Sequence, residues 1–285
     1  MSLKTFLSVT AIAAVTIFSS CKKNDTENTT TDEFETTFEI SGDEAVTDNL
    51  TQDDNDVLNE AAIDKNFMGN NFTGGTGTQS GTAGTLSCAT VTITPLIGWP
   101  KNIVIDFGTG CLSNGVFRKG KINVTLSDSL RKSGSVAVMT FDNYYVSGFK
   151  REGTITWTNT SAPGGKSWER KVENGKITAP NGTYWLHSGI KTVTQTAGVS
   201  TPQDLLDDVF SITGNHTITN AAGRTRTSTI LTALQKKTIC SNIDQGTVKV
   251  QGPNHYAIID FGNGACDNIA TISIDGRPPR TFLLR

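Results

Sequence analysis

From residue 86 to the C-terminus the chain consists of about thirteen short segments in which apolar and polar side chains alternate, with turn residues between them. Spacers such as Asn114-Gly115 and Asn181-Gly182 are pairs favoured in tight hairpins, so they predict an antiparallel meander. The alternation assigns Lys121 and Arg226 to the polar face of the sheet. A sheet with one apolar face must cover that face. We therefore expect an all-β domain over residues 86–285, folded as a two-layer sandwich or an open roll.

One phrase occurs twice, as Ile105-Asp-Phe-Gly-Thr-Gly-Cys111 and as Ile259-Asp-Phe-Gly-Asn-Gly-Ala-Cys266, each with a cysteine upstream. Each copy is interpreted as a strand that ends in a glycine turn and is fastened by a disulfide, Cys88–Cys111 or Cys240–Cys266. Each bridge would close a loop of about 25 residues, worth about 3 kcal/mol in the chain-entropy model. The alternative, a zinc site, lacks a CxxC spacing and a nearby histidine.

The aspartates of the repeated phrase, Asp106 and Asp260, are candidate calcium ligands beside glycine-rich turns. Calcium needs six to eight oxygen ligands, and only Asp267 follows the second copy closely. An aspartate at a strand end can instead accept hydrogen bonds from turn amides. The glycine pairs also lack the third glycine and the helix of a dinucleotide fingerprint. The sequence therefore predicts no metal and no cofactor.

The N-terminus has the pattern of an export signal. Lys4 precedes about fourteen mostly apolar residues, too few to span a membrane and enough for a signal peptide. The following Phe18-Ser-Ser-Cys21 resembles the lipobox of bacterial lipoproteins, which implies cleavage after residue 20 and lipid attachment, including palmitate, at Cys21. Lys22, rather than aspartate, follows the cysteine and implies sorting to the outer membrane. The alternative is an ordinary secretory signal with a chance cysteine.

The segment between the signal and the β domain is acidic. Residues 1–66 contain fourteen acidic residues and four lysines, whereas the remainder has a net charge of +8. We predict a disordered acidic tether over 21–40, a short helix over 41–68 and a Gly/Thr-rich linker over 69–85. Ser41 and Glu44 have capping-box spacing. The helix is interpreted as a short amphipathic element of the linker, or as a docking helix or fold-back clasp on the basic body.

No catalytic motif is present. His187, His216 and His255 fall on different predicted strands and belong to no metal or nucleophile motif. The acidic residues of the body are scattered, so a hydrolase with dispersed carboxylates is the weakest of three hypotheses. A non-enzymatic structural or binding role is the leading one.

Aromatic residues provide the remaining hypothesis, a module that binds carbohydrate or anionic polymers. Trp157, Trp168, Trp185 and Tyr144 lie on neighbouring predicted strands with lysine and arginine nearby. Exposed rings stack on sugars, and a basic surround attracts anionic polymers. The alternative is that these rings pack in the core, as strand aromatics usually do. No nucleic-acid motif accompanies the basic charge, so no nucleic-acid partner is expected.

With these motifs the chain resembles a group of uncharacterised β-rich lipoproteins of the Bacteroidota envelope. The resemblance rests on the lipobox, on both copies of the repeated phrase, and on the runs Asn143–Gly148 and Phe210–Gly214. It implies an outer-membrane protein held by its lipid, on the periplasmic face or the cell surface. A glycan or an envelope protein is the expected partner. The resemblance implies no particular activity.

Overall fold

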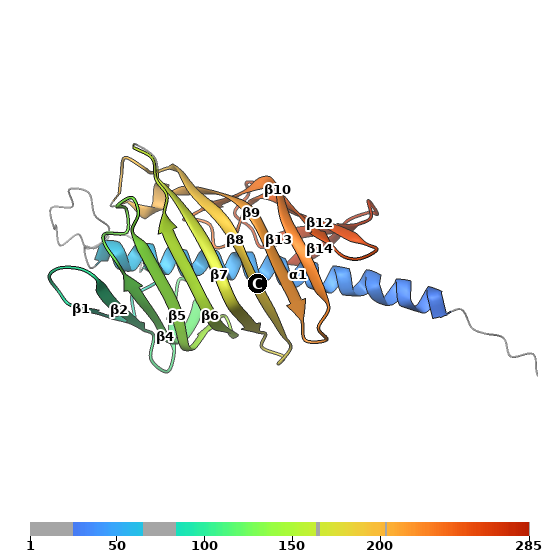
Figure 1. Ribbon diagram of the computed structural model, residues 1–285, viewed down its shortest axis with the longest axis horizontal. Coiled ribbons are helices and arrows are strands. Elements are labelled where there is room, and N and C mark those ends of the chain that lie inside the picture. The colour runs from blue at the N-terminus through green and yellow to red at the C-terminus, as the bar shows by residue number, and fades with distance from the viewer. Residues whose placement is uncertain (1–24, 65–83, 164–165, 203, 285) are drawn as a thin grey trace, which may run out of the picture.

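A computed structural model describes residues 25–64, 84–163, 166–202 and 204–284. It consists of one long helix, one 3-10 turn and a single fourteen-stranded sheet (Figure 1). The elements are α1 (Asp25–Asp64), β1 (Thr90–Thr94), β2 (Lys101–Asp106), β3 (Cys111–Ser113), β4 (Val116–Leu126), β5 (Val136–Val146), β6 (Phe149–Asn159), β7 (Ser167–Thr178), β8 (Tyr184–Ala197), η1 (Leu205–Asp207), β9 (Val209–Asn220), β10 (Thr225–Lys237), β11 (Gln245–Gln251), β12 (Tyr256–Asn263), β13 (Ile269–Ile274) and β14 (Arg280–Leu283).

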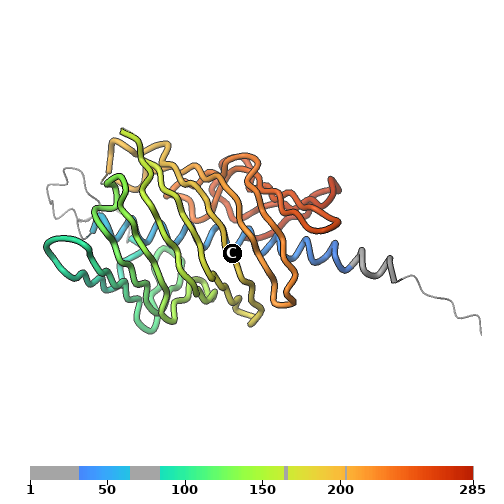
Figure 2. Tube along the Cα trace, in the orientation of Figure 1, coloured from blue at the N-terminus to red at the C-terminus, as the bar shows by residue number. Residues whose placement is uncertain are grey.

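The sheet is an antiparallel meander, which confirms the predicted all-β class. Its strands pair in chain order from β1 to β14, except that the three-residue β3 pairs only with β4. The sheet is open, with β1 and β14 as its edges. Of the two predicted architectures, the open roll is therefore the observed one, and the sheet curves around α1 (Figure 2).

The helix lies inside the roll and supplies the core that a second sheet layer would supply in a sandwich. Almost every residue of α1 from Thr36 to Ala62 is buried, on all sides of the helix. The predicted disordered tether over 21–40 is therefore wrong from Asp25 onward, and the predicted short helix begins too late. The signal peptide, Cys21 and nearly all of the 69–85 linker lie outside the described residues.

The predicted capping box is also wrong, because Ser41 lies in mid-helix. Its hydroxyl donates to the Thr37 carbonyl oxygen at 2.6 Å, one turn back. Glu44 does not reach back toward Ser41 but points at the strands. At Gly42 a side chain would clash with Phe282, since an added Cβ would lie 2.9 Å from that ring. The glycine therefore lets β14 close over the helix.

Bulges within the strands give the sheet its curvature. The register between β4 and β5 shifts beside Gly120, where an added Cβ would lie 2.1 Å from the Asn143 carbonyl oxygen. Gly153 marks a similar shift between β6 and β7. Both glycines have positive φ, +82° and +108°, and bulges at such positions bend a strand and increase its twist.

Both predicted disulfides are confirmed. Cys88 is bonded to Cys111 and Cys240 to Cys266, near the first and the last strands. In the two copies of the repeated phrase, the carboxylates of Asp106 and Asp260 each accept the amide two residues on, at 2.8 Å. The phrase is therefore a turn motif, as the alternative to calcium binding predicted.

Candidate functional site

The concave face of the sheet and the buried helix are joined by a row of ion pairs, here called the charge ladder. The described helix contains fourteen acidic residues and no basic one. The strands that face it carry a cationic residue as well as apolar ones at their buried positions. The ladder consists of Glu44, Asp48, Asp53, Asp54 and Asp56 of α1 with Arg118 of β4, Arg151 of β6, Lys191 of β8, His216 of β9 and Lys236 of β10.

The ladder runs across the middle of the sheet, from β4 to β10. Arg118 Nη2 lies 2.6 Å from Asp53 Oδ1, and Lys236 Nζ lies 2.9 Å from Asp56 Oδ2. Arg226, which the alternation assigned to the polar face, is instead buried and donates to the Thr37 hydroxyl at 3.2 Å. That assignment was wrong because the inner face of this sheet is cationic as well as apolar. The fold-back clasp, one of the alternatives for the predicted helix, is what the structure contains.

Glu44 is the most connected member of the ladder. Its carboxylate lies 3.2 Å from Lys191 Nζ and 3.0 Å from His216 Nδ1, and it accepts the Ser228 hydroxyl at 2.6 Å. Burial alone would raise the pKa of Glu44, but Lys191 and His216 hold it far below its usual range. His187 lies 3.3 Å from His216, and burial followed by repulsion from Arg151 lowers its pKa well below the usual value. Two of the three histidines thus converge, but inside the protein.

Two carboxyl groups outside the ladder have pKa values close to neutral pH in the folded protein. Burial raises the pKa of Asp43, with repulsion from Glu39, to about 7. Burial likewise raises the pKa of Asp208, which accepts Gln195 Nε2 at 2.6 Å, to about 7. An acid with a raised native pKa contributes stability at low pH, and that stability is lost as the pH rises through about 7.

Asp43 and Asp208 therefore give a testable pH dependence. We expect the two carboxyl groups to lower the free energy of unfolding as the pH rises from about 4 to about 7. His187, whose native pKa is lowered, acts in the opposite direction and lowers the free energy of unfolding as the pH falls below about 6.5. Asp43→Asn should stabilise the protein by about 1–2 kcal/mol more at pH 8 than at pH 5, after allowance for the partial exposure of Asp43. Urea unfolding at both pH values measures this. An equal effect at both would contradict a raised pKa.

An open cavity lies where the β3–β4 hairpin approaches the β10–β11 loop. It has two adjoining parts of about 470 and 330 Å³. Residues common to both are Asn114, Val116, Ile239, Cys240 and Ser241. We call this the polar cleft, because serine and asparagine side chains form much of its wall.

Three helix carboxylates, those of Asp53, Asp56 and Glu60, line the inner part of the polar cleft. Asp53 and Asp56 belong to the charge ladder. Glu60 accepts the backbone amides of Thr85 and Leu86 at 2.8 and 3.0 Å. Carboxylates held in this way fasten the helix and the returning chain, and they are not placed as a free acid–base pair.

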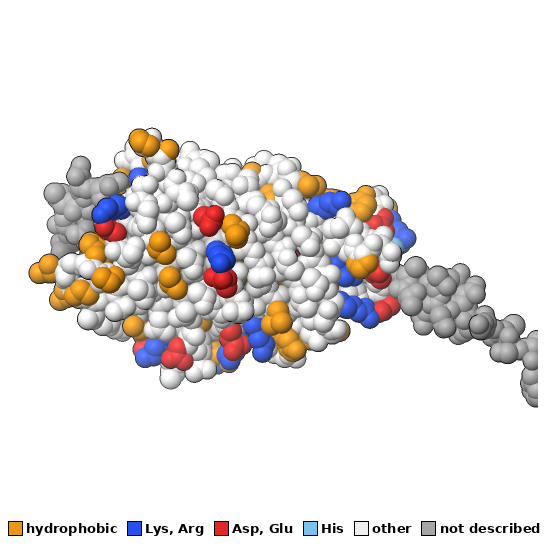
Figure 3. All heavy atoms as spheres, in the orientation of Figure 1, with side chains coloured by type: hydrophobic (Ala, Val, Ile, Leu, Met, Phe, Trp, Pro, Cys, Tyr) orange, Lys and Arg blue, Asp and Glu red, His pale blue; other side chains and the backbone are white. Residues whose placement is uncertain are grey.

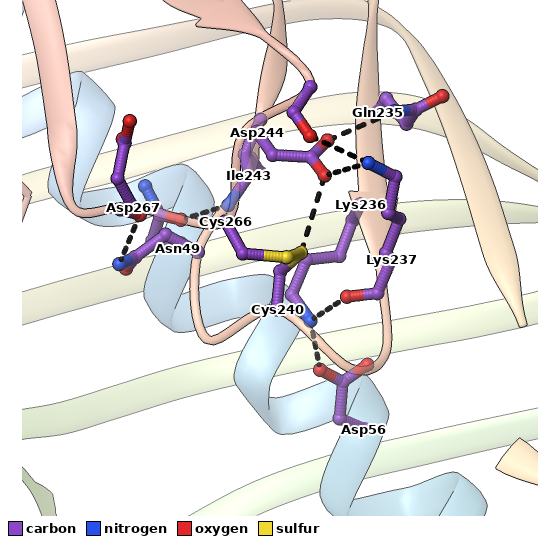
Figure 4. Close-up of a disulfide and its surroundings, with 12 residues drawn as sticks. Asn49, Asp56, Gln235, Lys236, Lys237, Cys240, Ile243, Asp244, Cys266 and Asp267 are labelled. Atoms are coloured by element: carbon purple, nitrogen blue, oxygen red, sulfur yellow. Dashed lines mark hydrogen bonds and ion pairs between the residues drawn. A yellow bond between two sulfur atoms is a disulfide. The ribbon is translucent and has the colours of Figure 1, made fainter. Parts of the chain in front are cut away.

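The Cys240–Cys266 disulfide forms another part of the cleft wall (Figure 4). Behind it the buried carboxylate of Asp244 lies 3.0 Å from Lys237 Nζ and 3.4 Å from Cys240 Sγ. Cys240, Asp244 and Cys266 are close enough together to surround a metal ion. A disulfide sulfur carries no thiolate, however, so in the bonded form these residues do not make a metal site.

The predicted ligand-binding rings are in the core. The exposed fractions of Trp157, Trp168, Trp185 and Tyr144 are 2%, 7%, 3% and 0%. Trp185 Nε1 donates to the Thr47 hydroxyl of the helix at 2.7 Å. These four residues therefore do not form an exposed stacking surface, and the core alternative is confirmed. Their inward orientation reflects the helix, which requires large side chains to fill the space around it.

The comparisons with known proteins add no identification. No family model matches the chain, and neither a curated protein nor a solved structure is significantly similar to it. Among the described residues no helix has the length and apolar character needed to cross a membrane.

Proposed function

We propose that this chain is a lipid-anchored protein of the cell envelope with a non-enzymatic binding or structural role. The observation that carries the proposal is the position of α1. The helix begins at Asp25, four residues after the cysteine of the lipobox-like motif, and continues into the core of the sheet. An acyl group on Cys21 would therefore be joined to the folded body by a short segment and a helix.

The first turns of α1 project beyond the sheet (Figure 1). Residues 25–31 add roughly 10 Å at the rise of an α-helix. This projection supports a fixed stalk between the bilayer and the sheet in place of the flexible tether expected from composition. The resemblance of the signal region supports the outer membrane as location, on either face.

A binding or structural role, with a glycan or an envelope protein as partner, accounts for the site better than catalysis. The helix carboxylates that line the polar cleft are held by strand cations or backbone amides. The glycan hypothesis based on tryptophan stacking loses its support because those rings are buried. A sugar would have to bind through the serine and asparagine side chains of the polar cleft.

Membrane partition of Cys21→Ala tests the anchor. The wild-type protein, expressed in a Gram-negative host, should be labelled by a palmitate analogue and enter the detergent phase of a Triton X-114 extraction. Cys21→Ala should lose the label and move to the aqueous phase, because the acyl chains supply the membrane affinity. Cys240→Ala with Cys266→Ala is the matched cysteine control and should keep the label. An unlabelled, exported wild-type protein would overturn the proposal.

A further inference from the structure

The loop between β1 and β2 presents large apolar side chains to solvent. Leu96 is 83% exposed, Ile97 92% and Trp99 37%. No charged residue lies between Pro95 and Pro100. The loop forms one end of the molecule, where a group of hydrophobic side chains is visible at the left of the surface (Figure 3). Single exposed apolar residues are common on proteins, but a projecting group of them marks a contact surface.

The conformation of this loop is fixed from within. Lys101 Nζ donates to the carbonyl oxygens of Pro95 and Leu96 at 3.0 and 2.9 Å, and it lies 5.0 Å from the centre of the Trp99 ring. Lys101 itself is buried. The side chains of Leu96 and Ile97 are therefore not needed to hold the loop together, and their exposure does not stabilise the isolated fold.

We propose that the Pro95–Pro100 loop inserts into the interfacial region of a lipid bilayer. Three features favour lipid over a protein groove. The loop is a projecting tip without formal charge. Two of its carbonyl groups are already satisfied by Lys101, and its two prolines have no amide hydrogen, so insertion desolvates fewer backbone groups. Trp99 lies at the base of the tip, and tryptophan prefers the level of the lipid headgroups.

The position of the loop indicates which bilayer it meets. The N-terminal end of α1 projects at the opposite end of the molecule (Figure 1). A chain anchored through Cys21 would thus present the loop away from its own membrane, toward a second bilayer. The insertion of the loop is independent of the anchor, whereas the second bilayer rests on the proposed function.

Tryptophan fluorescence tests the insertion directly. Of the four tryptophans Trp99 is the exposed one, and the other three are buried. The chain from residue 21, with Cys21→Ser so that no acyl group contributes, is titrated with vesicles of phosphatidylethanolamine and phosphatidylglycerol. We expect a blue shift, quenching by brominated lipid, and co-flotation. Leu96→Ser with Ile97→Ser should weaken binding about tenfold or more.

The matched control removes exposed apolar side chains elsewhere. Leu186 and Leu231 are 47% and 57% exposed on β8 and β10, and the Leu186→Ser, Leu231→Ser variant should bind as the parent does. Equal loss in both double variants, or no binding by the folded parent, overturns the insertion. If the loop binds a soluble protein and the chain does not bind vesicles, the proposed insertion is also overturned.

A second arm uses acylated protein already inserted in vesicles. Addition of unlabelled vesicles should increase turbidity through clustering, and the loop variant should not. If the unacylated chain inserts into vesicles but the acylated chain does not cluster them, the proposed contact with a second bilayer is overturned, while the insertion of the loop stands. If Cys21 carries no lipid, the proposed function fails while the fluorescence result still decides the loop.

Discussion

Deleting residues 25–64 is expected to abolish the folding of the β-sheet. The helix buries Ile40, Leu50, Val57 and Leu58 completely or nearly so. At about 1.5–3 kcal/mol for each such side chain, their burial contributes on the order of 6–12 kcal/mol, similar to the net stability of a whole domain. Deletion would also leave the strand cations of the charge ladder without partners. We expect residues 84–285 to show no cooperative unfolding transition when urea denaturation is monitored by circular dichroism.

A peptide of residues 25–64 provides the control for this deletion. Added to residues 84–285 under oxidising refolding conditions, it should restore a cooperative transition whose midpoint rises with peptide concentration. A peptide of the same composition in scrambled order should not. A sheet that unfolds cooperatively at the same urea concentration without any helix would contradict the view that α1 is its core.

The second large effect is expected at the Arg151–Asp54 pair of the charge ladder. The two side chains are 1% and 0% exposed, with 2.6 Å between Arg151 Nη2 and Asp54 Oδ2. Arg151 Nε and Nη1 and Asp54 Oδ1 have no hydrogen-bond partner among the described residues. Either Arg151→Met or Asp54→Leu should cost about 3–5 kcal/mol of unfolding free energy, because each leaves the other charge buried alone.

The double variant should recover most of that loss. With both charges removed, neither desolvation cost remains, and apolar side chains fill the space. Urea unfolding of all four proteins completes the cycle. Lys171 and Glu173 form the surface control at 2.8 Å, with about half of each side chain exposed, and removing either should change stability by less than about 1 kcal/mol. Additive losses in the buried cycle would contradict the interpretation.

The strands were predictable from the sequence because alternation and turn residues are local signals. Every predicted segment corresponds to a strand, and only the three-residue β3 was missed, being too short to show a pattern. The two disulfides were equally accessible, since each cysteine pair flanks a copy of the same phrase.

The helix was not predictable in its extent or its place. A buried helix is normally apolar on at least one face. In α1 acidic and polar residues occur on every side, among apolar ones such as Leu50 and Leu58, and its sequence resembles that of a disordered acidic segment. The opposite charges of the leader and the body were visible in the sequence. Their pairing was not, because Arg151 and Asp54 are far apart in the chain and only the curvature of the sheet brings them together.

The continuity between the N-terminal stalk and the buried helix has a mechanical consequence. A force that pulls on the N-terminus acts along the axis of α1, roughly along the length of the sheet (Figure 1). The contacts between Thr36 and Ala62 would then be loaded together in shear and would not be peeled apart one after another. Withdrawal of the helix requires that all ion pairs of the ladder break at once. The fold should therefore withstand a larger force applied to the N-terminus than a force applied to the edge strand β14.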